Sequence, residues 1–153
     1  MIRILNILCI SVVLLITSSC NKELITPYDH PFFYVHSNQA SQINVQANRN
    51  EVVDYKVFFS TKMQYEPITL KYEVIVGKGL QEGVDFELIN TTKELVFKSG
   101  YFEMPISIRW KSNPIDATKD NSITIKLLSN DKNITIGLPG PDKNQTELKI
   151  VKI

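Results

Sequence analysis

Side chains that could catalyse a reaction are few in this sequence and lie near its start. The 153 residues include two histidines, His30 and His36, and two cysteines, Cys9 and Cys20. A nucleophilic triad needs a serine, threonine or cysteine beside a base and an orienting acid, and the sequence has no Gly-x-Ser-x-Gly elbow. A zinc site needs three or four closely spaced ligands, mostly histidine or cysteine. We therefore expect that the protein is not an enzyme.

Two other reaction classes receive little support. Gly77-Lys78-Gly79 follows a strand-like segment but precedes no helical one, so it does not predict a phosphate-binding loop. Paired carboxylates could hydrolyse glycosidic bonds, and the sequence leaves this open because their separation depends on the fold.

Binding through exposed aromatic rings is the better supported chemistry. The candidate sugar-stacking residues are Tyr65, Tyr101 and Trp110. Tyr65 lies in a turn-like segment. Tyr101 occupies the same alternating positions as the polar residues that follow it, so both tyrosines are expected to face water. Trp110 occupies the same alternating positions as the apolar residues, so the alternative interpretation is that Trp110 is a core residue or a plug at the end of a strand. A further aromatic cluster consists of Tyr28, Phe32, Phe33 and Tyr34. Its alternative explanation is a first strand at the sheet edge.

Charge excludes one class of partner. The sequence contains seventeen Lys and Arg residues and sixteen Asp and Glu residues, so its net charge is +1. A nucleic-acid-binding domain normally carries a basic excess. We expect no nucleic-acid partner.

Strands must position these candidates, because apolar and polar residues alternate along most of the chain. Such alternation places one face of a strand on a core and the other in water. Gly, Pro, Asn and Asp clusters separate the segments and indicate turns. The expected fold is all-β, a single sandwich of two antiparallel sheets over residues 32–153. The expected strands are 32–35, 43–47, 55–60, 68–76, 86–89, 95–98, 102–110, 123–127 and 148–151.

The first twenty residues have the charge and length of a secretory signal peptide. Arg3 precedes the apolar run 4–16, which is shorter than the roughly 20 residues of a membrane-spanning helix. Thr17-Ser18-Ser19-Cys20 resembles a bacterial lipoprotein lipobox, although Thr17 stands where an aliphatic residue is usual. The resemblance implies that residues 1–19 are cleaved and that Cys20 is lipidated and anchors the chain to a membrane. The alternative is an ordinary thiol at Cys20.

Residues 20–31 form the expected lipidated start and tether, because Pro27 and Pro31 interrupt a segment with few apolar residues. Asn21-Lys22-Glu23 is similar to an export signal of some Bacteroidota lipoproteins. That similarity implies an outer-membrane lipoprotein displayed on the cell surface, and a periplasm-facing anchor is the alternative.

Residues 52–150 carry a resemblance to a known family of domains. Gly83-Val84-Asp85-Phe86 precedes Leu95-Val96-Phe97-Lys98-Ser99-Gly100, and 68–73, 106–108 and 123–127 match strands in the same order. This pattern resembles a Calx-β domain, which implies an immunoglobulin-like sandwich. Similar domains occur in surface lipoproteins of Bacteroidota, often beside polysaccharide-uptake machinery.

The same resemblance raises the question of calcium, which some Calx-β domains bind through loop carboxylates. Ca²⁺ takes six to eight oxygen ligands. Only Glu51, Asp116 and Asp120 remain as candidates, and Lys149-Ile150-Val151-Lys152 replaces a closing acidic cluster. We expect no cofactor, and calcium is the one alternative.

Two functional hypotheses fit these observations. The first is a binding module that holds a polysaccharide or serves a glycan-uptake complex of the outer membrane. The second is a structural or adhesive envelope protein that contacts another protein through a sheet edge or loops. Several exposed aromatic rings on one sheet face would favour the first, and a large flat apolar patch would favour the second.

Overall fold

The computed structural model describes residues 30–64 and 66–153. These residues form strands and turns, with no helix in the two described ranges. The strands are β1 Phe32–Val35, β2 Gln42–Val45, β3 Val52–Ser60, β4 Ile68–Val76, β5 Phe86–Leu88, β6 Glu94–Phe97, β7 Glu103–Trp110, β8 Ser122–Asn130, β9 Thr135–Ile136 and β10 Glu147–Lys152.

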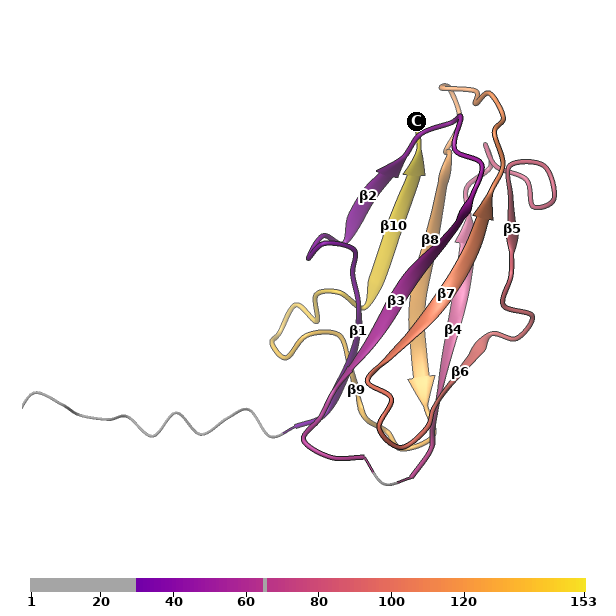
Figure 1. Cartoon of the computed structure of the whole chain (residues 1–153). Coiled ribbons are helices and arrows are strands. Elements are labelled where there is room, and N and C mark those ends of the chain that lie inside the picture. The colour runs from indigo at the N-terminus through magenta and orange to yellow at the C-terminus, as the bar shows by residue number, and fades with distance from the viewer. Residues whose placement is uncertain (1–29, 65) are drawn as a thin grey trace, which may run out of the picture.

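Two five-stranded sheets pack face to face and confirm the predicted sandwich (Figure 1). The first sheet has the order β5-β7-β3-β1-β9, and the second has the order β2-β10-β8-β4-β6. The chain enters β1 at one end of the sandwich, and the C-terminus lies at the other end.

The expectation of purely antiparallel sheets was wrong at two places. β1 pairs parallel with β9, and β2 pairs parallel with β10. The physical reason is that the first two strands lie in different sheets, each beside a C-terminal strand that runs in the same direction. β1 is therefore not an edge strand, because it lies between β3 and β9.

The core lies between the sheets and contains alternate residues of nearly every strand. Phe33 stacks on Phe59 with 4.3 Å between ring centroids, and Phe97 lies at 5.0 Å from Phe33 in a tilted arrangement. A fully buried large apolar side chain contributes about 1.5–3 kcal/mol. This core is continuous and holds the faces of both sheets in fixed positions.

One buried charged cluster interrupts this apolar interior at the C-terminal end of the sandwich. The fully buried Lys152 ammonium donates to the carbonyl oxygen of Lys111 at 3.0 Å and lies 3.4 Å from Asp85 Oδ1. Asn113 Nδ2 donates to the same oxygen at 2.8 Å, and the backbone N–H of Gln81 donates to Asp85 Oδ2 at 2.9 Å. Burial raises the pKa of Asp85, but the hydrogen bonds and the Lys152 charge outweigh it and hold the pKa below its usual range.

Two residues depart from the expected alternation at strand ends. In the strand predicted at 102–110, alternation would place Phe102 on the core face with Trp110, but Phe102 precedes β7 and is 43% exposed. Val76 ends β4 and is also exposed. Val76 is exposed although it still pairs with Ile123. At such strand ends alternation does not determine burial.

Candidate functional site

An aromatic row lies on the outer face of the first sheet. We define the row as Phe32, Tyr34 and His36, which follow one another along one side of β1, and Phe58 on β3. The Phe32 and Tyr34 ring centroids lie 5.4 Å apart, and those of Tyr34 and His36 lie 5.6 Å apart. Phe58 stacks on Tyr34 at 5.3 Å and on His36 at 4.7 Å. All four rings are half-buried, so each keeps part of its surface available to a ligand.

Strand register brings these rings together. Tyr34 lies directly opposite Phe58 in the antiparallel β1/β3 pair. Because successive side chains of a strand point to opposite faces, Phe33 and Val35 enter the core while Tyr34 points outward. Aromatic pairs in such cross-strand positions stabilise the sheet, so the row is a rigid feature of the fold.

A tight turn after β1 orients His36. Its Nδ1 accepts a hydrogen bond from the backbone N–H of Gln39 at 3.1 Å. Asn38 and Gln39 have positive φ angles of 49° and 65°, and Ser37 bridges to Ala40. The turn therefore holds the imidazole ring against Phe58.

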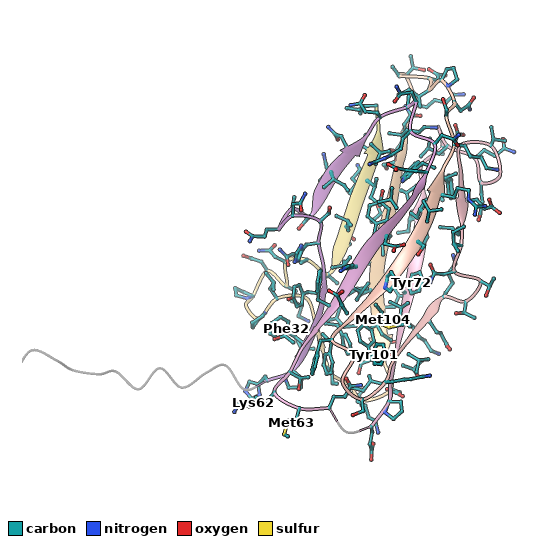
Figure 2. The ribbon with its side chains drawn as sticks, viewed as in Figure 1. Phe32, Lys62, Met63, Tyr72, Tyr101 and Met104 are labelled. Atoms are coloured by element: carbon teal, nitrogen blue, oxygen red, sulfur yellow. The ribbon has the colours of Figure 1, made fainter. Side chains whose placement is uncertain are left out.

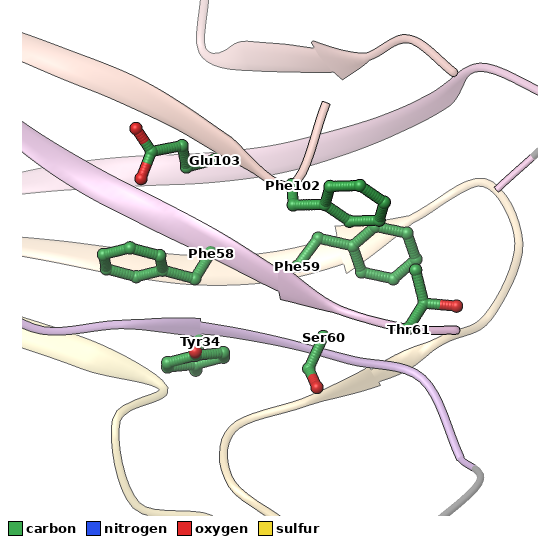
Figure 3. A pocket seen from close by; sticks show the side chains of 7 residues that line it. All are labelled: Tyr34, Phe58, Phe59, Ser60, Thr61, Phe102 and Glu103. Carbon is green, nitrogen blue, oxygen red and sulfur yellow. The ribbon is translucent and has the colours of Figure 1, made fainter. Parts of the chain in front are cut away.

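Two shallow grooves flank the row. The aromatic groove has a volume of about 390 Å³ and is lined by Tyr34, Phe58, Phe59, Ser60, Thr61, Phe102 and Glu103. In Figure 3 the rings of Tyr34, Phe58 and Phe102 come from three neighbouring segments of the chain. The turn groove has a volume of about 400 Å³ and is lined by residues 36–39, 54–56 and 58. Phe58 borders both grooves, so they form one continuous surface.

Charged side chains beside the row have polar partners. Lys56 Nζ contacts Glu103 Oε1 at 2.6 Å, and Ser107 Oγ donates to Asp54 Oδ1 at 2.6 Å. Aromatic planes next to polar side chains can bind a molecule that has both apolar faces and hydroxyl groups.

The predicted sugar-stacking residues have three different positions. Tyr101 is 56% exposed and directly precedes Phe102 of the aromatic groove. Figure 2 places Tyr101 and Phe32 toward the same end of the sandwich. Tyr65 lies outside the described residues.

The expectation that Trp110 stacks on a sugar was wrong, because its side chain has 0% exposure and offers no surface to a ligand. Its indole Nε1 donates to the Tyr55 hydroxyl at 2.9 Å inside the core. Trp110 is a core residue, as the alternative interpretation held, because buried and more exposed residues alternate along β7 up to its last residue.

Tyr55 allows a pH prediction. Burial is the main cause that raises its pKa to about 12, against the lowering effects of the Trp110 hydrogen bond and the Arg49 charge. The unfolded chain releases this proton near pH 10 and the folded chain retains it, so the free energy of unfolding should fall between pH 10 and pH 12. Denaturant unfolding at several alkaline pH values would measure this fall. The Tyr55→Phe variant should have a smaller fall, and an unchanged profile would contradict the assignment.

The three candidate calcium ligands already have partners within the chain. Arg49 Nε contacts Glu51 Oε1 at 2.6 Å. The side chain and backbone of Thr118 donate to Asp116 Oδ1, and Ser122 Oγ donates to Asp120 Oδ1 at 2.7 Å.

These acids also do not converge on one point. In the described ranges, no three His, Cys, Asp or Glu residues lie close enough together to hold a metal ion. Asp120 instead packs against Gly77, where a Cβ would collide with the Asp120 carbonyl oxygen. The structure does not assemble the proposed calcium site.

The expected anchor at Cys20, its signal peptide and most of the tether lie outside the described residues. Within residues 30–64 and 66–153, no helix has the length and apolarity needed to cross a membrane.

Sequence reasoning missed His36 and Phe58 as site residues. Phe58 has the opposite parity to Tyr55 and Val57, which was a signal that it faces outward. His36 extends the outward parity of Tyr34 by one step. Their convergence depends on the β1/β3 register, which no motif in the sequence specifies.

The sequence matches no protein-family model and no curated protein. The similarity to Calx-β domains therefore stays a prediction based on its motifs.

Proposed function

We propose that this chain is a non-enzymatic lipoprotein of the bacterial outer membrane that binds a polysaccharide on its aromatic row. The observation that carries the proposal is the set of four half-buried rings, whose neighbouring centroids lie 4.7–5.6 Å apart along one sheet face. Tyr34, His36 and Phe58 stack on one another, so their outward parts form one continuous apolar surface. The apolar faces of sugar rings could lie against this surface.

The surroundings of the row support a sugar ligand over a purely apolar one. Ser60, Thr61 and Glu103 line the aromatic groove beside Phe58 and Phe102. Hydroxyl and carboxylate oxygens can bond to sugar hydroxyl groups while the rings cover the apolar faces of the sugar.

The proposed location follows from the lipobox-like segment. Lipidation at Cys20 would hold the domain on the outer membrane by its acyl chains, with the tether before residue 32 separating it from the lipid surface. Display on the cell surface would let the protein capture a polysaccharide itself or serve as an accessory of a glycan-uptake complex.

One observation favours the second hypothesis, a structural or adhesive protein. In the described part of the chain, residues 52–56 of β3 pair with β7 only, because β1 pairs with residues 57–60. Unpaired backbone along a strand can accept a strand from another protein. The same segment borders the turn groove, so this partner would compete with the polysaccharide.

The Phe58→Ala variant tests the proposed function. We expect the full chain in detergent micelles to bind at least one polysaccharide of a plant, host and microbial panel, as measured by calorimetry. Phe58→Ala should weaken that binding about tenfold or more, because removal of a central aromatic contact usually costs 2 kcal/mol or more.

The matched control is Leu128→Ala, since Leu128 is an exposed apolar residue on the opposite sheet. It should leave binding unchanged. Equal losses in both variants, or no binding to any polysaccharide in the panel, would refute the proposal.

A further inference from the structure

A third groove lies at the end of the sandwich where the C-terminus is. This amide groove has a volume of about 460 Å³ and is lined by Asn44, Gln46, Asn48, Arg49, Asn50 and Glu51. Backbone hydrogen bonds fix its position, because Ile153 N donates to Val45 O at 2.8 Å and Ala47 N donates to Ile153 O at 2.6 Å. It is therefore distant from the end at which β1 begins (Figure 1).

The amides of this groove are uncommitted. Arg49 and Glu51 pair with each other at 2.6 Å. By contrast, the side-chain amides of the four Asn and Gln residues have no hydrogen bond among the residues that the structure describes. Each amide has both a donor group and an acceptor oxygen, so each could bond to a pair of hydroxyl groups.

β3 lines two of the grooves, and the segment before it leads from the amide groove, which extends to Asn44 on β2 of the second sheet. Glu51 directly precedes β3 and lines the amide groove, Asp54 and Lys56 line the turn groove, and Ser60 and Thr61 line the aromatic groove. At about 3.3 Å per residue, the segment from Glu51 to Thr61 spans roughly 30 Å. That length far exceeds a disaccharide and suits a polymer.

The charges along this path indicate the class of polymer. Besides His36, which counts as neutral at pH 7, the three grooves contain two basic side chains, Arg49 and Lys56, and three acidic ones, Glu51, Asp54 and Glu103. Both basic groups have carboxylate partners at 2.6 Å. Among the residues that the structure describes, a polyanion would meet no Lys or Arg side chain along this path that lacks a carboxylate partner, and the acidic excess would repel it.

We propose that the ligand is an extended, uncharged polysaccharide that lies along β3 and contacts all three grooves. Its sugar faces stack on the aromatic row at one end, and its hydroxyl groups bond to the amide groove at the other. This inference rests on the proposed function, because it extends the same binding surface to a second, polar subsite.

The test compares chain length with the position of the substitution. The probes are neutral cello-, xylo- and manno-oligosaccharides, from disaccharides up to chains long enough to span β3, titrated calorimetrically into the full chain in micelles. The variant is Asn48→Ala/Asn50→Ala. The matched control is Asn144→Ala, an exposed asparagine in the segment before β10.

We expect affinity to rise with chain length, and the double variant to reduce binding of the longest chains about tenfold. The same variant should leave short chains unaffected, and Asn144→Ala should leave all chains unaffected. Equal affinity for short and long chains, or binding of acidic polysaccharides only, would overturn the inference.

The outcome separates this inference from the proposed function. Loss of binding in Phe58→Ala with no effect of the double variant would retain the polysaccharide site and reject the extension along β3. Failure of every oligosaccharide and polysaccharide to bind would reject both, and would direct attention to a protein strand at residues 52–56.

Discussion

Replacing Lys152 by methionine is expected to lower the free energy of unfolding by about 3–5 kcal/mol, because removal of one partner leaves a buried charge uncompensated. Methionine retains an apolar stem of similar length, so the change removes mainly the ammonium group. Asp85 would keep its hydrogen bonds from Asn113 and Gln81 but lose the opposite charge at 3.4 Å. Denaturant unfolding followed by circular dichroism would measure the difference.

Lys149→Met is the matched control, since Lys149 lies on the same strand and is exposed. Its effect should remain within about 0.5 kcal/mol, as is usual for surface substitutions. If Lys152→Met were as mild as this control, the ion pair would not contribute to stability.

The same cluster predicts a loss of stability in acid. The pKa of Asp85 lies below its ordinary 3.8 in the folded chain, so the unfolded chain takes up the proton first as the pH falls. The stabilisation is present above about pH 4 and is lost as the pH falls further, through the folded-state pKa. Asp85→Asn should flatten this acid limb of the stability profile, and an unaltered limb would assign the acid sensitivity to other carboxylates.

Trp110→Ala should be the second large effect, with a loss of about 3–5 kcal/mol, the usual cost of removing a buried tryptophan. The substitution creates a cavity and also removes the indole donor from the Tyr55 hydroxyl. Tyr101→Ala is the control, since it removes an aromatic ring that is 56% exposed. Chemical unfolding of both variants would distinguish a core tryptophan from a ligand platform, because a platform residue would affect binding and leave stability nearly unchanged.

Tyr55→Phe separates hydrogen bonding from packing, because it removes only the hydroxyl group that accepts from Trp110. Tyr55→Phe keeps the ring but leaves the buried indole N–H without its acceptor, which costs about 1–3 kcal/mol. Equal stability of Tyr55→Phe and the wild type would show that this hydrogen bond makes no net contribution.

The sequence was sufficient to predict the sandwich because alternation records which face each strand buries. Residues 32–35 were predicted as a strand and form β1, and residues 68–76 form β4 with the same bounds. β3 is longer than the predicted segment, since its first residues pair with β7 although Val52 is exposed. The alternation of apolar and polar residues does not indicate a strand at residues whose apolar side chains are exposed.

The rest depended on long-range pairing that local patterns do not encode. β9 has only two residues and was not predicted, yet it makes β1 an interior strand. Tyr34 and Phe58 lie 24 positions apart in the sequence and meet only through the β1/β3 register. The aromatic row therefore required the structure, and Tyr101 is exposed as expected, although Phe102 beside it is exposed as well.

The position of β1 also has a mechanical consequence. β1 is the first strand after the proposed tether, and it is bonded to β3 on one side and to β9 on the other. A pull on residue 30 would act along the strand direction and load both ladders in shear, so their hydrogen bonds would resist together and not break one after another. In the proposed anchored state, a pull on the domain would be transmitted through this strand, and its two ladders would set the force at which the domain begins to unfold.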